Sequence, residues 1–210
     1  MSKTIEDKLN EGRQFRNIDA SRLEVRTLED GGRIVEGYAT TFDTPYELLS
    51  ADGYTLLEVI DRGAFDNCDM SDVIMQYDHV GRVFARTSNG TLTVDVDEIG
   101  LHIRARLDGT ELGRRIYEEI AGGYTDKMSF GFSVREQRRE VTKDDERTVV
   151  TRHVVDVSKL WDVSAVSIPA NDATTINARN LFDGVIAEIE AERLKRKKLL
   201  TRLKMEGIKL

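Results

Sequence analysis

Three short segments of this chain carry side chains that could act together as a base, a nucleophile and an acid. Tyr77-Asp78-His79 offers an imidazole, Met128-Ser129-Phe130-Gly131-Phe132 a hydroxyl, and Leu160-Trp161-Asp162-Val163-Ser164 a carboxylate. A hydroxyl that loses its proton to an imidazole, which is itself oriented by an acid, is the arrangement of a serine hydrolase. The chain order His79, Ser129, Asp162 differs from the three orders most often met in such enzymes.

The candidate nucleophile lies in a segment that alternates as a β-strand does. Phe130, Phe132 and Val134 are expected to point into the core, and Ser129 and Gly131 to point outward. We therefore expect an accessible hydroxyl beside a glycine that leaves room for an extended substrate. Taken alone, the segment has a more common explanation, since serine and glycine often populate the solvated face of a strand.

The candidate base and acid also have ordinary explanations. His79 ends a half-apolar segment, where an isolated histidine is more often a surface or hydrogen-bonded structural residue than a base. Asp162 stands between Trp161 and Val163, which are expected to be buried, so its charge needs a partner that offsets the loss of hydration. A histidine imidazolium would be a suitable partner.

Metal and phosphate chemistry have little support in the sequence. The histidines His79, His102 and His153 form no pair at the spacing of a zinc site. The glycines between positions 109 and 123 lack the spacing and the strand–loop–helix setting of a phosphate-binding loop. We expect neither a metal nor a cofactor. The single Cys68 cannot form a disulfide within the chain, which fits a reducing compartment, and we expect an inert thiol.

The composition is that of an ordinary soluble protein. Of the 210 residues, 33% are charged and 40% are hydrophobic, which suits one globular body with a buried core and an appendage. No apolar run approaches a membrane span, and the first residues lack the apolar centre of a secretion signal. The net charge of −7 argues against general nucleic-acid binding. A basic run over 193–204 is explained by a solvated helix face.

Residue patterns along the chain predict an α+β fold that is mainly β. Alternation around glycine-containing turns predicts hairpins over 23–39 and 92–107. A last strand pair is expected over 130–141 and 148–157, before the apolar run 160–168.

One helix between the strands has recognisable start and stop signals. Asp108-Gly109-Thr110 offers cap residues, and Gly122-Gly123 ends the segment. Leu112, Ile116 and Ile120 are expected to form its apolar stripe.

Read together, these segments resemble the prohead proteases of tailed bacteriophages, a family of serine peptidases whose fold resembles that of the herpesvirus maturation proteases. The resemblance spans roughly residues 20 to 180. It rests on six segments in the right order and spacing: 35–39 with 42–43, 58–65, 77–79, 100–101, 128–132 and 161–171.

The resemblance implies a role for each candidate residue. In the family, the histidine that matches His79 acts as the base and the serine that matches Ser129 as the nucleophile. An acidic residue, often glutamate, precedes the Val-Ser pair, and here it is Asp162, whose shorter side chain reaches less far. The herpesvirus relatives use a second histidine in that role, so His153 is kept as the alternative third member. We favour Asp162.

The resemblance also implies an architecture and a task. We expect a barrel-like antiparallel sheet flanked by a few helices in a protease domain over 20–180. A flexible or helical arm over 1–19, to which we assign no function, would precede it, and a charged helical tail over 181–210 would follow. The implied activity is a serine endopeptidase that cleaves scaffold or capsid-protein extensions, and itself, during prohead maturation. Self-cleavage is expected within the tail, between 180 and 203.

The same resemblance implies where and with what the protein acts. Its partners would be the major capsid protein or its scaffold region, with self-association, and neither a membrane nor nucleic acid. Its place would be the assembling prohead in the host bacterial cytoplasm. The alternative is a catalytically inactive scaffolding or structural protein of the same fold.

Overall fold

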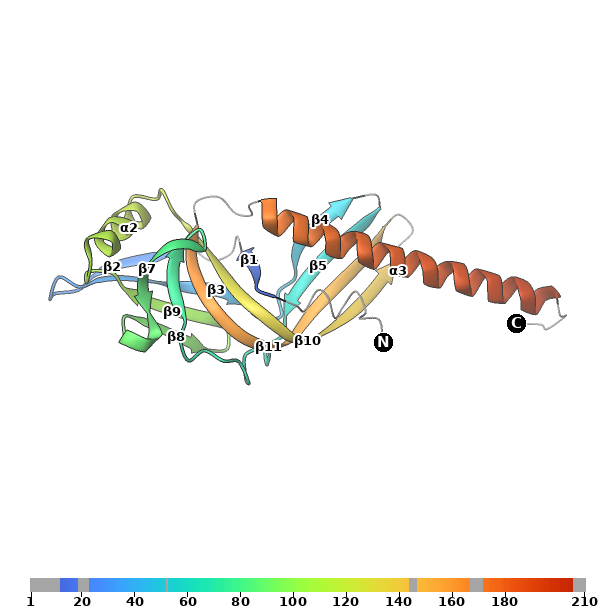
Figure 1. Ribbon diagram of the computed structural model, residues 1–210, viewed down its shortest axis with the longest axis horizontal. Coiled ribbons are helices and arrows are strands. Elements are labelled where there is room, and N and C mark those ends of the chain that lie inside the picture. The colour runs from blue at the N-terminus through green and yellow to red at the C-terminus, as the bar shows by residue number, and fades with distance from the viewer. Residues whose placement is uncertain (1–11, 19–22, 52, 144–146, 167–171, 206–210) are drawn as a thin grey trace.

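The computed structural model describes residues 12–18, 23–51, 53–143, 147–166 and 172–205. Within these residues, strands predominate, and two sheets form the body of the molecule (Figure 1). The predicted α+β class, mainly β, is confirmed.

The larger sheet is built around one long antiparallel hairpin, β10–β11. Along its main path the strand order is β1-β10-β11-β5-β4. Strand β6 lies outside this path and pairs with both β11 and β7. The strands are β1 (Gln14–Ile18), β4 (Tyr46–Ala51), β5 (Tyr54–Ile60), β6 (Ile74–Tyr77), β7 (Val80–Arg86), β10 (Lys127–Lys143) and β11 (Thr148–Val166).

Strand β11 has a different parallel neighbour at each end. Its first half, 148–154, pairs with β5, and 162–165 pair with β6. Several register shifts interrupt the β10–β11 ladder between Gly131 and Gln137, and irregularities of this kind bend a strand and increase its twist. The sheets of the described residues stay open and include parallel pairs, so the expected antiparallel barrel describes the fold only loosely.

The smaller sheet confirms both predicted hairpins. Its order is β2-β3-β9-β8, with all neighbours antiparallel. The strands are β2 (Glu24–Thr27), β3 (Arg33–Thr41), β8 (Leu92–Val96) and β9 (Gly100–Arg106), and a short 3-10 turn, η1 (Thr87–Asn89), precedes β8.

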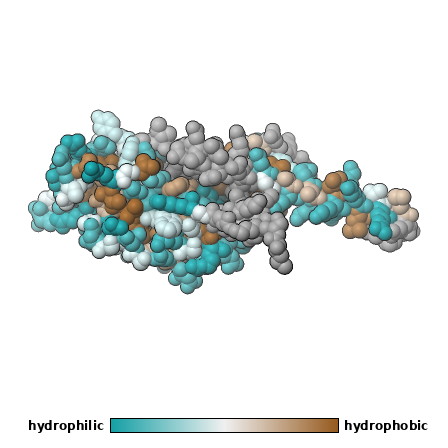
Figure 2. Space-filling model, in the orientation of Figure 1, coloured by the Kyte–Doolittle hydropathy of each residue, from teal (hydrophilic) through white to brown (hydrophobic). Residues whose placement is uncertain are grey.

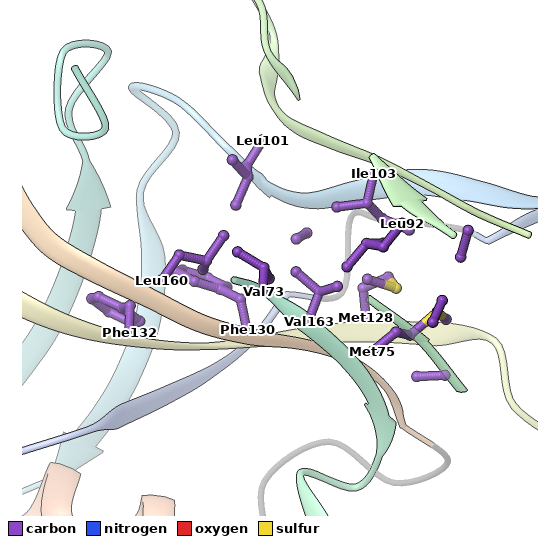
Figure 3. Packing of buried hydrophobic residues seen from close by; sticks show 14 of the residues in the cluster. Val73, Met75, Leu92, Leu101, Ile103, Met128, Phe130, Phe132, Leu160 and Val163 are labelled. Carbon is purple, nitrogen blue, oxygen red and sulfur yellow. The ribbon is translucent and has the colours of Figure 1, made fainter. Parts of the chain in front are cut away.

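Side chains from both sheets meet in one hydrophobic core. Figure 3 shows Leu101 and Ile103 of the smaller sheet facing Phe130 and Val163 of the larger one. All four are inaccessible to solvent. Truncation of such a side chain costs about 2–5 kcal/mol. This packing therefore fixes the middle of β10 and β11, including the side chains on the opposite face of these strands.

Helix α2 (Glu111–Ala121) begins where the sequence predicts. The hydroxyl of Thr110 accepts a hydrogen bond from the Gly113 amide at 2.9 Å, as an N-cap does. The buried stripe includes Ile116 and Ile120 as expected, but Leu112 is 39% exposed and the expectation for it was wrong.

The helical tail was expected to begin at position 181. Helix α3 (Asp172–Met205) begins earlier, at Asp172. Val185 and Ile189 pack on Leu56 and Val150 of the larger sheet. The C-terminal half of α3 extends beyond the sheet (Figure 1), where hydrophilic and apolar residues are mixed along its surface (Figure 2). No helix among the described residues is both long and apolar enough to cross a membrane.

Candidate active site

His79 lies in the tight turn between β6 and β7. Tyr77 pairs with Val80, so Asp78 and His79 are the two central residues of the hairpin loop. Their φ angles are 48° and 60°, and such two-residue loops with positive φ at both positions usually contain Asn-Gly. A non-glycine residue in this region costs on the order of 1 kcal/mol. The backbone of this turn is therefore strained, and it fixes the position of the imidazole.

Ser129 lies near the start of β10, between β1 and β11. Its register partners are Asn17 on β1 and Ser164 on β11. Phe130 and Phe132 point into the core as predicted. The expectation of an accessible hydroxyl was wrong, because Ser129 is 0% exposed: β1 pairs along β10 and covers it.

Asp162 lies opposite Gly131 on β11 and is completely buried. Val163 is buried as expected. Trp161 is not, since it is 40% exposed; its indole N–H donates to the Ser133 hydroxyl at 2.9 Å.

The three candidate side chains are joined by hydrogen bonds. His79 Nε2 lies 2.5 Å from Ser129 Oγ, and His79 Nδ1 lies 2.5 Å from Asp162 Oδ2. With its proton on Nδ1, facing the carboxylate, the imidazole presents an unprotonated Nε2 to the hydroxyl. The geometry permits proton transfer from the hydroxyl to Nε2.

The carboxylate of Asp162 has two further partners that the sequence analysis did not identify. Its Oδ1 accepts a hydrogen bond from the Arg13 guanidinium, and Ser164 Oγ donates to Oδ2 at 2.7 Å. Burial would raise the pKa of Asp162, but the hydrogen bonds from His79, Arg13 and Ser164 outweigh it and lower this pKa below its ordinary value. The acid is therefore ionised at neutral pH.

One of these partners had a signal in the sequence. Ser164 stands two residues after Asp162, so the two side chains share a face of the strand. Arg13 lies within the segment that we expected to be a flexible or helical arm, whereas Gln14–Ile18 of that segment form strand β1. Nothing local to Arg13 marks it as a partner of a residue so distant in the chain.

His153 is not brought to this cluster. It lies opposite Arg138 on β10, nine positions along the strand from Ser129. Its Nδ1 is 2.7 Å from Asp61 Oδ1 and 2.8 Å from the Arg138 guanidinium.

Strand β1 makes direct contacts with the cluster. The Ser129 hydroxyl lies 2.8 Å from the carbonyl oxygen of Arg16, and the ring centroids of Phe15 and His79 are 4.3 Å apart. The hydroxyl has one proton, which it can donate either to this carbonyl or to the imidazole.

Other reactive groups lie outside this cluster. Burial raises the pKa of the Cys68 thiol to about 12, so little of the reactive thiolate is present at neutral pH. Among the described residues, no group of three or more histidine, cysteine, aspartate and glutamate side chains is placed to hold a metal ion.

Comparison with known proteins identifies the family of this chain. A family model described as caudovirus prohead serine protease matches residues 21–185. No curated protein matches the chain. A solved structure of the bacteriophage T4 capsid assembly protease, gp21, is similar at 12% identity and a TM-score of 0.40, covering 73% of this chain and 98% of that one. The family model covers most of the sequence. The chain belongs to the caudovirus prohead serine protease family.

Proposed function

We propose that this protein is a serine endopeptidase in which Ser129 is the nucleophile, His79 the general base and Asp162 the acid that orients the base. The observation that carries the proposal is the continuous contact from Asp162 through His79 to Ser129, with 2.5 Å at each step. Membership in the prohead protease family supports a role in phage prohead maturation.

The reaction would be an acyl transfer in two steps. Ser129 Oγ attacks the carbonyl carbon of the peptide bond, and its proton passes to His79 Nε2. The carbon–nitrogen bond then breaks, His79 returns the proton to the leaving amine, and an ester to Ser129 remains. Water activated by His79 cleaves that ester, which releases the new carboxylate and restores the hydroxyl.

The buried charge of Asp162 would stabilise the intermediate state of the base. When His79 gains a proton it becomes an imidazolium, and the ionised carboxylate 2.5 Å from Nδ1 balances that charge from a buried position. An acid in this place also fixes the tautomer and orientation of the ring, and its loss costs about 10⁴-fold in rate in such triads.

The substrates that we propose are extended segments of the scaffold or of the capsid protein, together with the chain itself. Strand β10 carries the nucleophile, and among the described residues its side away from β11 is paired only with the short β1, over 128–132. If β1 leaves, this edge is free to pair with a polypeptide in an extended conformation, a common mode of peptide recognition.

Co-expression with the major capsid protein tests this function. Wild-type protein should produce capsid-protein fragments that mass spectrometry identifies, and the Ser129→Ala variant should produce none. A serine-directed fluorophosphonate should label the wild-type chain at Ser129, with labelling lost in the same variant. Identical fragments from both forms, or no fragments and no labelling from either, would instead identify an inactive scaffolding protein.

A further inference from the structure

Strand β1 lies directly beside the strand that carries Ser129. Strand β1 pairs antiparallel with β10, and its register places Asn17 opposite Ser129 and Phe15 opposite Gly131. The carbonyl oxygen of Arg16 lies 2.8 Å from Ser129 Oγ. A substrate bound for cleavage likewise has an extended backbone beside the nucleophile and a carbonyl group next to the hydroxyl.

The residues before Arg16 extend this likeness to a bound substrate. The Phe15 ring packs on the His79 ring, and the Arg13 guanidinium lies 5.0 Å from the centroid of the Phe15 ring while it contacts Asp162. The segment on the N-terminal side of the Arg16 carbonyl therefore covers both the base and the acid. Water and other peptides are excluded, in keeping with the complete burial of Ser129.

The Arg16 side chain is buried against Glu58 on the core face of the sheet. Its Nε lies 2.5 Å from Glu58 Oε1 and its Nη2 lies 3.0 Å from Glu58 Oε2, so the guanidinium binds both carboxylate oxygens. The Arg16 guanidinium also lies 5.6 Å from the centroid of the Phe132 ring. Such two-point pairing matches the planar fork of arginine and not the point charge of lysine.

The side chains around Glu58 keep it charged. Glu58 is fully buried on β5, where it also accepts hydrogen bonds from the Tyr46 hydroxyl and from the Arg152 guanidinium. Burial works against the charge, but Arg16 and Arg152 prevail and hold the pKa of Glu58 at about 2. Without Arg16, the carboxylate would keep Arg152 and Tyr46 as partners and would have room for the guanidinium of another chain.

We propose that Glu58 forms the base of the pocket for the residue whose carbonyl is attacked, that this pocket selects arginine, and that Arg16–Asn17 is a bond which the enzyme cuts in its own chain. The proposal rests on the proposed role of Ser129 as the nucleophile. Ser129 Oγ bonds to the carbonyl carbon of Arg16, the bond to the Asn17 nitrogen breaks, and His79 carries the proton from the hydroxyl to the new amine. Water then hydrolyses the ester, leaving a carboxylate on Arg16 and the hydroxyl on Ser129.

The first test is the position of self-cleavage in the full chain. Purified wild-type protein, incubated alone, should yield a species that begins at Asn17, and Ser129→Ala should stay intact at this bond. Arg16→Glu should remove the cut, because it places two carboxylates against each other. The matched control is Arg26→Glu on the neighbouring β2, whose native arginine is half exposed and pairs with Glu36; the cut should persist. A cut between positions 16 and 17 that persists in the Arg16→Glu variant overturns the proposed selection of arginine.

The second test ranks peptides on the unaltered enzyme and needs no variant to fold. Peptides with the sequence of residues 12–19 carry arginine, lysine, alanine or glutamate at the position of Arg16. The arginine peptide should have a kcat/KM at least about tenfold above that of the alanine peptide, as expected for a paired charge, and the glutamate peptide should be the poorest. Glu58→Gln, matched by circular dichroism, should reduce the preference for arginine.

The outcomes separate this inference from the proposed function. Ser129-dependent cleavage that favours alanine or glutamate would overturn the arginine pocket and leave the protease intact. If the peptides are not cut, the same ranking is read from the residues that precede the cuts in the capsid protein, and non-basic residues there overturn the pocket. A chain that cuts neither itself, the peptides nor the capsid protein, and does not react with a fluorophosphonate, overturns both.

Discussion

Gly131 lies directly opposite Asp162, and a Cβ atom on Gly131 would be 2.0 Å from Asp162 Oδ1. The same atom would lie 2.7 Å from Arg13 Nε and 3.1 Å from the Phe15 ring. The absence of a side chain at this position therefore allows the carboxylate, the guanidinium and β1 to meet over one strand. This contact gives a physical reason for the glycine between the two core phenylalanines.

Gly131→Ala should disable the enzyme without unfolding it. The methyl group must displace the Asp162 carboxylate, and misplacing a catalytic group by about 1 Å costs about 10²-fold in rate. The measurement is kcat/KM on a cleaved peptide, with circular dichroism as the check on folding. Gly109→Ala is the matched control, since nothing lies within 4 Å of a Cβ there. A Gly131→Ala variant within twofold of wild type would contradict this account.

Ser129→Ala and His79→Ala should each lower peptide cleavage by about 10⁴-fold or more, and the double variant should be no worse than either. Residues that act as one unit give losses that do not add, because removal of one leaves the other without its function. The measurement is kcat on one peptide for all three variants. Near wild-type turnover in Ser129→Ala would exclude it as the nucleophile, and additive losses would show that the two residues act independently.

Asp162→Asn should cost far more activity than His153→Gln. The substitution at 162 removes the counter-charge of the base and favours the wrong tautomer, an effect of up to about 10⁴-fold. His153 instead pairs with Asp61 and Arg138, away from Ser129, so its substitution should leave kcat within a few fold. The measurement is kcat for both variants under one set of conditions, and the reverse ranking would transfer the third role to His153.

The strained turn should make one inactive variant more stable than another. His79→Ala and His79→Gly both remove the imidazole, but only glycine adopts a φ of 60° without steric cost. We expect the free energy of unfolding of His79→Gly to exceed that of His79→Ala by about 1 kcal/mol. Urea denaturation of the two variants measures the difference. An alanine variant equal to or above the glycine variant would mean that the turn holds no strain.

Local features of this fold were readable from the sequence, because their causes lie within a few residues. The alternation in β8 and β9 and the Thr110 cap of α2 belong to this class. Leu112 was misjudged although its cause is also local: Gly113, Ile116, Tyr117 and Ile120 follow the helical period more closely and form the buried stripe.

The burial of the site beneath β1 could not be predicted from the sequence, because it depends on contacts between distant segments. Gln14–Ile18 have no strong strand pattern and become a strand only because β10 offers an edge. The burial of Ser129 and the contact of Arg13 with Asp162 both follow from that pairing. Trp161 was expected to be buried, as part of the apolar run 160–168. It lies instead on the outer side of β11, where Lys159 Nζ is 4.6 Å from the centroid of its ring.

The buried charge of Glu58 gives a pH dependence of stability with a definite sign. Its pKa in the folded protein is about 2, against an ordinary value of 4.5, so the unfolded chain binds more protons between these values. The ionised carboxylate therefore stabilises the fold fully above about pH 4.5, and this contribution is lost as the pH falls toward 2. A shift of this size corresponds to about 3 kcal/mol.

Comparison with Glu58→Gln isolates this contribution from the other carboxylates that titrate in acid. The free energy of unfolding of wild type should exceed that of the variant at pH 6, and the difference should shrink by about 3 kcal/mol as the pH is lowered to 2. Glu118→Gln is the control, because its native carboxylate is exposed and pairs with Arg33 at the surface, where an ion pair contributes little. Urea titrations at several pH values provide the measurement. A difference between wild type and Glu58→Gln that does not change with pH would mean that Glu58 is not held as a buried carboxylate, and the arginine pocket would lose its physical basis.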